Sequence, residues 1–110
     1  MRLIYSVLVA AICVGLATVA WAADPGAGRK QAGQQCRTCH GLDGIAQIPI
    51  APHLAGESQI YLETQLKAFR SGKREHEMMS VVAKNLTDAE ISNLSAWYAS
   101  IKITAEMPDS

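Results

Sequence analysis

The chain carries the stretch Cys36-Arg37-Thr38-Cys39-His40, in which two residues separate a pair of cysteines and a histidine directly follows the second. Residues three apart lie on one side of a helical turn, so the two thiols face the same way. Haem has two vinyl groups along one edge, and each thiol can add across one of them to form a thioether. The histidine is then carried under the ring, where its imidazole can bind iron. The stretch predicts one haem c, held through Cys36 and Cys39, with His40 as an axial ligand.

Other uses of a cysteine pair fit the chain less well. A structural zinc site needs a second cysteine pair or two histidines at ligand spacing, and the remaining histidines, His53 and His76, are far apart. A thioredoxin-like redox pair needs a βαβ setting, which the sequence does not indicate. A disulfide within so short a loop would be strained.

The N-terminal segment has the pattern of a secretory signal. A positive residue, Arg2, precedes an apolar stretch over residues 3–20, and Ala20-Trp21-Ala22 follows as a small-x-small cleavage pattern. We predict a signal peptide over 1–22, one domain over 23–110, a periplasmic location and no stable membrane insertion after cleavage. An uncleaved anchor is the alternative, because about 18 apolar residues just span a bilayer.

Composition narrows the function classes further. The formal net charge of the 110 residues is +0, and no basic patch stands out, so we expect no nucleic-acid partner. Residues 23–110 contain few aromatic side chains, and a small domain with so thin a core commonly needs a cofactor to hold it. A buried haem would supply the missing apolar surface.

The sequence predicts an all-α domain without strands. Asp24 and Pro25 indicate the start of a helix that runs toward Cys36. A second helix is expected from Ser58 to a C-terminal glycine at Gly72.

The last helix has the clearest start signal in the sequence. Thr87 and Glu90 form a capping box.

Glycines and prolines interrupt residues 41–56, which are therefore expected to form a long loop. Gly28 and Ala32 lie one turn apart and predict a small-residue face on the first helix that permits close approach of another helix.

The second axial ligand is less well defined by the residues alone. Iron in an electron-transfer haem is commonly bound by His and Met. The first methionine leaves with the predicted signal and the last lies in the polar tail, so Met78 and Met79 remain, in a stretch between helices that we expect to be irregular. We favour Met79. The alternatives are ligation by Met78, ligation by His53 or His76, and an open site, and one or both methionines could instead fill gaps in the core.

Several stretches resemble one known family. They are, in order, Cys36–Gly44 (CRTCHGLDG), Pro52–Gly56 (PHLAG), Tyr61–Gly72 (YLETQLKAFRSG), Met79, Leu86–Ile91 (LTDAEI) and Trp97–Tyr98. The chain is similar to the class I c-type cytochromes, and within them to one half of the dihaem cytochrome c4 group and to its monohaem c553-type relatives. The resemblance implies three to five helices wrapped around one covalently attached haem. A single CxxCH stretch implies a monohaem protein.

The resemblance also implies roles for particular residues. The family's axial Met stands seven residues before a Leu-Ser/Thr-Asp stretch, as Met79 stands before Leu86. Pro52 matches a proline whose carbonyl accepts a hydrogen bond from the imidazole that corresponds to His40.

Three aromatic positions match the family as well. Trp97 matches an aromatic that packs the last helix on the first, and Tyr61 and Phe69 are expected to line the haem pocket. His53 stands where the family often has lysine, and no role is expected for it.

These expectations together predict a one-electron carrier rather than an enzyme, because iron with both faces occupied does not readily bind substrate. Its partners would be redox proteins: a dehydrogenase, an oxidase or a membrane electron-transport complex. Arg70, Lys73 and Arg74 form either a basic docking patch or a solvated helix end. The alternative functions are a cytochrome subunit fixed in a periplasmic dehydrogenase or oxidase complex, and a ligand-binding haem protein with an open sixth site.

Overall fold

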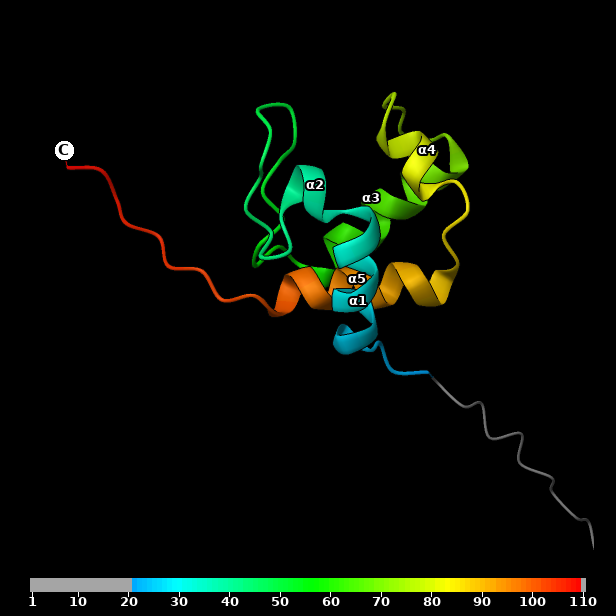
Figure 1. The fold of residues 1–110 in the computed structure, drawn as a ribbon, viewed down its shortest axis with the longest axis horizontal. Helices are drawn as coiled ribbons and strands as arrows, with labels where there is room; N and C mark the ends of the chain where they lie inside the picture. Colours follow the sequence, from blue (N-terminus) through cyan, green and yellow to red (C-terminus); the bar gives the residue numbers. More distant parts are fainter. Residues whose placement is uncertain (1–20, 110) are drawn as a thin grey trace, which may run out of the picture.

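The computed structural model describes residues 21–109, so nearly all of the predicted signal peptide lies outside the described residues. Within this range the chain forms five α-helices and no strand (Figure 1). They are α1 (Pro25–Gln35), α2 (Arg37–His40), α3 (Gln59–Ser71), α4 (Met79–Ala83) and α5 (Asp88–Ser100). None of the helices described is long and apolar enough to cross a bilayer. The all-α prediction is confirmed.

The predicted helix ends are confirmed by their caps. The Asp24 carboxylate accepts hydrogen bonds from two amides in the first turn of α1. The Ser58 hydroxyl caps α3, which ends at Gly72 with φ 81°, a left-handed conformation that glycine adopts without strain. The capping box of Thr87 and Glu90 starts α5. Each of these signals is local, which is why the sequence alone shows them.

Helix α1 crosses α5 at close range, as Figure 1 shows. A Cβ atom on Gly28 would lie 1.9 Å from the backbone oxygen of Asn93, so only glycine permits this approach. One turn further along, Ala32 is fully buried. The Asp24 amide donates to Asn93 Oδ1 at 2.8 Å and ties the start of α1 to the same residue. The predicted small-residue contact face is confirmed.

The core lies where α1, α3 and α5 meet. It consists of Ala32, Leu62, Phe69, Ala83, Leu86, Ile91, Leu94 and Tyr98. Figure 1 shows α2 and the loop that follows it above the left end of α5, and α4 above its right end. The extended tail after α5 leaves the domain.

One prediction about secondary structure is wrong. The stretch around Met79 was expected to be irregular, and it contains α4 instead. His76 organises the start of this helix: its Nδ1 accepts from the amides of Met78 and Met79 at 3.2 and 3.4 Å, and its own amide donates to Ser80 Oγ at 3.0 Å. The N-cap of α4 is Met78, which makes no side-chain capping bond, so the pattern of preferred capping residues does not reveal this helix.

Candidate haem-attachment site

The two cysteines and the histidine of the opening stretch occupy one short turn. Cys36 joins α1 to α2, and Cys39 and His40 lie in α2. Both thiols are free and half-buried, and the His40 amide donates to the Cys36 carbonyl at 2.9 Å. The His40 side chain is 8% exposed. The turn therefore places two half-buried cysteines beside a buried imidazole.

The His40 imidazole is oriented by a backbone carbonyl. Its Nδ1 lies 2.9 Å from the oxygen of Pro52. A carbonyl can only accept a hydrogen bond, so Nδ1 carries the hydrogen, and the lone pair of Nε2 is left for a metal. This is the contact between Pro52 and His40 that the family resemblance implied.

The long loop that carries Pro52 is closed by its own hydrogen bonds. The Gly44 carbonyl accepts from the amides of Leu54 and Ala55 at 2.8 and 3.1 Å. The Ala46 amide donates to Nδ1 of His53 at 2.8 Å. His53, to which the sequence assigned no role, thus braces the loop beside Pro52.

Two aromatic side chains of α5 hold the chain directly after the histidine. Tyr98, buried, donates from its hydroxyl to the Gly41 carbonyl at 2.9 Å, and Trp97 donates from Nε1 to the Leu42 carbonyl at 2.9 Å. Trp97 also meets α1, because the guanidinium of Arg29 lies 5.7 Å from its ring centroid. Sequence reasoning missed the role of Tyr98, since its partner is 57 residues away.

The other candidate residues differ in where they lie. Phe69 is part of the core cluster, and Cys36 and Met79 both pack against that cluster. Tyr61, on α3, is 50% exposed and is not among the members of the cluster. The structure thus brings Cys36, Phe69 and Met79 to one apolar cluster.

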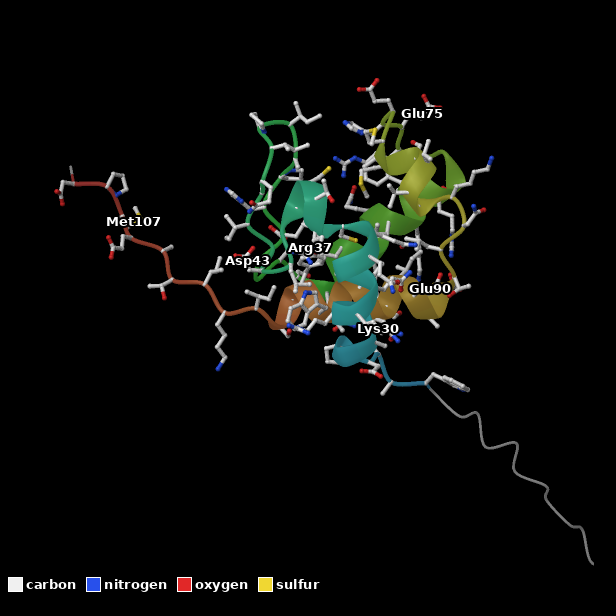
Figure 2. The ribbon with its side chains drawn as sticks, in the orientation of Figure 1. Lys30, Arg37, Asp43, Glu75, Glu90 and Met107 are labelled. Carbon is white, nitrogen blue, oxygen red and sulfur yellow. The ribbon has the colours of Figure 1, made fainter. Side chains whose placement is uncertain are left out.

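Met78 and Met107 are placed less favourably than Met79 for binding a metal beside the core. Met78, next to Met79, is 53% exposed. Met107 is 88% exposed on the tail, and Figure 2 shows it well away from the helices. Within the described residues, Met79 is the methionine that combines partial burial with contact to the core.

These residues fit a covalently attached haem. The donor set comprises two unpaired thiols and an imidazole whose Nε2 is free. Several partly buried apolar side chains pack against the same core cluster as Cys36, among them Leu42, Leu54, Leu66 and Met79. An apolar ring held by two thioethers suits such surroundings.

Comparison with known proteins decides the family. Residues 23–97 match the family described as cytochrome c oxidase, cbb3-type, subunit III. The chain is also 40% identical over 82 residues to cytochrome c-554(548) of Halomonas halodenitrificans, which covers 72% of this chain and 98% of that protein. The chain belongs to the c-type cytochromes.

Longer relatives contain a similar domain. Cytochrome c4 of Pseudomonas aeruginosa is 35% identical over 98 residues, covering 89% of this cytochrome and 49% of that protein. The thiosulfate dehydrogenase electron acceptor of Thiomonas intermedia is 34% identical over 104 residues, covering 93% of this cytochrome and 45% of that protein. The solved cytochrome c4 of Acidithiobacillus ferrooxidans matches with a TM-score of 0.68 at 30% identity, covering 76% of this chain and 53% of that one. The cytochrome therefore spans about half the length of these relatives.

Family membership establishes the cofactor and the general role. The cytochrome carries haem c bound covalently through Cys36 and Cys39. It is an electron carrier rather than an enzyme. Its fold is that of the class I c-type cytochromes, as the sequence predicted.

The Cys36 thiol, as long as it is free, is held neutral. Burial raises the pKa of the Cys36 thiol to about 11, with a smaller contribution from the nearby Cys39, whereas the hydroxyl of Tyr98 acts in the opposite direction. Burial also raises the pKa of Tyr98. A neutral, proton-bearing hydroxyl is what the hydrogen bond from Tyr98 to the Gly41 carbonyl requires.

Replacing Tyr98 by phenylalanine is expected to lower the free energy of unfolding of the haem-loaded protein by about 1–3 kcal/mol, because a buried carbonyl loses its donor. Denaturant unfolding followed by circular dichroism measures this change. Thr64→Val is the matched control, since the Thr64 hydroxyl also donates to a carbonyl, that of Ile60 at 2.8 Å, but from an exposed position. Equal losses in the two variants would contradict a special role for Tyr98.

The basic residues at the end of α3 are mostly engaged within the domain. Arg74 donates to Gln65 at 2.6 Å and lies 4.5 Å from the centroid of the Phe69 ring. Arg70 binds Leu86 and Asp88. Two of the three charges in the expected docking patch therefore serve intramolecular contacts.

Proposed function

We propose that this cytochrome is a periplasmic one-electron carrier whose iron is bound by His40 on one face and by Met79 on the other. The observation that carries the proposal is the hydrogen bond from His40 Nδ1 to the Pro52 carbonyl, because it aims a free Nε2 away from the loop. Met79 supports it from the other side of the site, since it packs against the same core cluster as Cys36.

The residues of the chain have distinct tasks in this proposal. When bound, haem supplies an iron that gains or loses one electron. The Pro52 carbonyl fixes the ring plane of His40 and increases the basicity of Nε2. The Met79 thioether, a soft and neutral ligand, favours the reduced state and so raises the potential. Because His40 and Met79 would both hold the iron, they would keep water and substrates from it.

The proposed partners are redox proteins of the same compartment. A relative that is named as the electron acceptor of thiosulfate dehydrogenase supports a dehydrogenase as electron donor. Carriers of this kind form small, short-lived interfaces, which permit rapid exchange between donor and acceptor. A periplasmic location is supported by the signal-like segment 1–22, and the family match begins at residue 23.

A potentiometric titration with visible spectra tests the proposal on the haem-loaded protein. A single one-electron Nernst transition is expected, and the reduced protein should not bind carbon monoxide, because Met79 occupies the sixth site. Rapid binding of carbon monoxide to the native reduced protein would instead support the ligand-binding alternative with an open site.

A further inference from the structure

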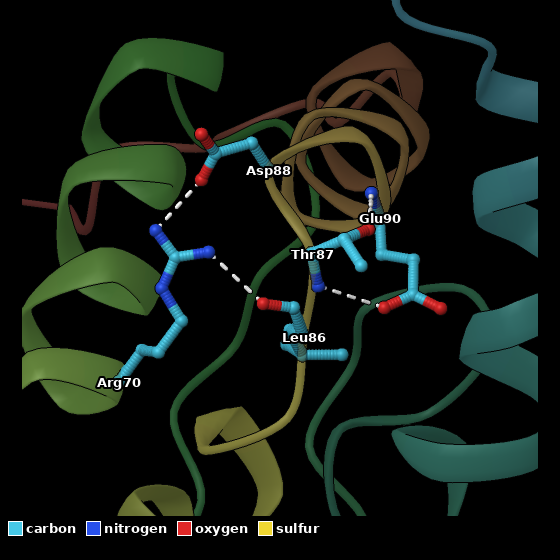
Figure 3. Close-up of polar contacts among 5 residues, drawn as sticks. All are labelled: Arg70, Leu86, Thr87, Asp88 and Glu90. Carbon is cyan, nitrogen blue, oxygen red and sulfur yellow. Dashed lines mark hydrogen bonds and ion pairs between the residues drawn. The ribbon is translucent and has the colours of Figure 1, made fainter.

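Arg70 connects two helices that are distant in sequence. It lies in the last turn of α3, and its guanidinium donates to the Leu86 carbonyl at 2.9 Å and to Asp88 Oδ1 at 2.7 Å (Figure 3). The hydrogen bond from Arg70, and then its positive charge, keep the pKa of the Asp88 carboxyl below the usual value. The contact is therefore a charge-assisted one, which is stronger than a bond between neutral groups.

The carbonyl that Arg70 binds belongs to a peptide group held from both sides. The amide of the same peptide unit, that of Thr87, donates to Glu90 Oε2 at 2.9 Å. The Glu90 amide in turn donates to Thr87 Oγ1 at 3.1 Å. Figure 3 shows Arg70 approaching from α3 and Glu90 from α5. Side chains from two helices thus immobilise one peptide plane.

This peptide lies where the segment that begins at Met79 joins α5. The segment consists of α4, whose first residue is Met79, and a short connection to α5. Its residue Ala83 is fully buried, and Leu86 is 6% exposed. The Leu86 amide donates to the Ala83 carbonyl at 3.1 Å. A helix of five residues is not stable by itself, so the position of Met79 depends on how both ends of its segment are anchored.

We propose that Arg70 is a positioning residue for the axial ligand Met79, because it fixes the Leu86–Thr87 peptide relative to α3 and so restrains the segment that carries the sulfur. This inference rests on the proposed ligation by Met79. Loss of the restraint lets the segment move away and increases the fraction of protein whose sixth site is open. An external ligand that needs the open site then binds more tightly in proportion to that fraction.

The experiment compares Arg70→Gln with Lys73→Gln in the haem-loaded, oxidised protein. Glutamine is too short to reach both acceptors of Arg70. Lys73 lies just beyond the same helix and is exposed, so its replacement removes an equal charge without removing the contact. We expect the affinity for cyanide to rise about tenfold in Arg70→Gln, the factor that corresponds to about 1.4 kcal/mol, and to stay unchanged in Lys73→Gln.

A second measurement separates positioning from general stability. In Arg70→Gln, the long-wavelength absorption of the sulfur–iron bond should disappear at a lower denaturant concentration than the helical circular dichroism signal. If both signals shift together and cyanide affinity stays at the native value, Arg70 is merely structural and the proposal is wrong. Equal rises in cyanide affinity for the two variants would assign the effect to charge and would also overturn it.

The ligand assignment is tested separately by replacing Met79 itself. If Met79→Ala abolishes the sulfur–iron absorption while Arg70→Gln changes nothing, the inference about Arg70 fails and the ligation stands. If Met79→Ala leaves that absorption intact, the ligation fails and the inference about Arg70 fails with it. Arg70→Lys should recover part of the native cyanide affinity, because an ammonium can still pair with Asp88.

Discussion

Met79→Ala is expected to abolish the weak long-wavelength absorption of the oxidised protein and to lower its reduction potential by on the order of 0.1–0.3 V, within the range of about 0.8 V that axial ligands span. The physical reason is the loss of a neutral thioether that favours reduced iron. Water, hydroxide or an added ligand then takes the vacated position. Visible spectra of the oxidised form and a potentiometric titration measure both effects.

The neighbouring methionine provides the control for this prediction. Met78→Ala removes the same group one residue away, from a side chain that is 53% exposed. We expect its spectrum and potential to match those of the native protein. If Met78→Ala causes the loss and Met79→Ala does not, the assignment must move to Met78. Native behaviour in both variants would favour a histidine ligand, with His76 first because its Nδ1 accepts hydrogen bonds from the amides of Met78 and Met79.

The second large effect concerns the crossing of α1 and α5. Gly28→Ala is expected to lower the free energy of unfolding by about 3 kcal/mol or more, because the added methyl group meets rigid backbone. It would lie 1.9 Å from the Asn93 oxygen and 2.5 Å from the Asn93 carbonyl carbon. The helices must therefore separate, and the contacts of the fully buried Ala32 weaken with them. Denaturant unfolding of the haem-loaded protein measures the loss.

Gly33→Ala is the matched control on the same helix. A Cβ atom at this position has no neighbour within 4 Å. Alanine has the higher helix propensity, so this variant should be more stable than the native protein by up to about 1 kcal/mol. The same chemical change thus has opposite signs at two positions of α1. Destabilisation of similar size at both positions would contradict the assignment of the loss at Gly28 to the helix crossing.

Features encoded by neighbouring residues could be predicted from the sequence. The caps of α1, α3 and α5 depend on side chains within a few residues of the helix start. The CxxCH stretch is equally local, since its spacing alone brings two thiols and an imidazole to one turn. Groups whose partners lie within a few residues meet whatever the rest of the fold does, so their pattern can be recognised in the sequence.

Features that depend on distant partners could not be predicted from the residues. Arg70 appeared only as one charge of a basic cluster, because its partners lie 16 and 18 residues further on. Tyr98 appeared only as part of a motif, although its hydroxyl binds the chain directly after His40. The start of α4 could not be predicted because its N-cap residue is Met78, whereas Ser, Thr, Asp or Asn usually stands at this position.

By itself, the sequence determined the attachment of haem at Cys36 and Cys39, the all-α class and the start of three helices, since each follows from chemistry within a few residues. The family resemblance had implied the contact between Pro52 and His40, and only the tertiary structure decided the other contacts that hold the site: Tyr98 on Gly41, and Arg70 on the peptide beyond α4. These contacts join segments that the chain separates widely. They form only when burial of the core brings their helices together, because a hydrogen bond between distant residues cannot offset the entropy of closing the intervening loop by itself.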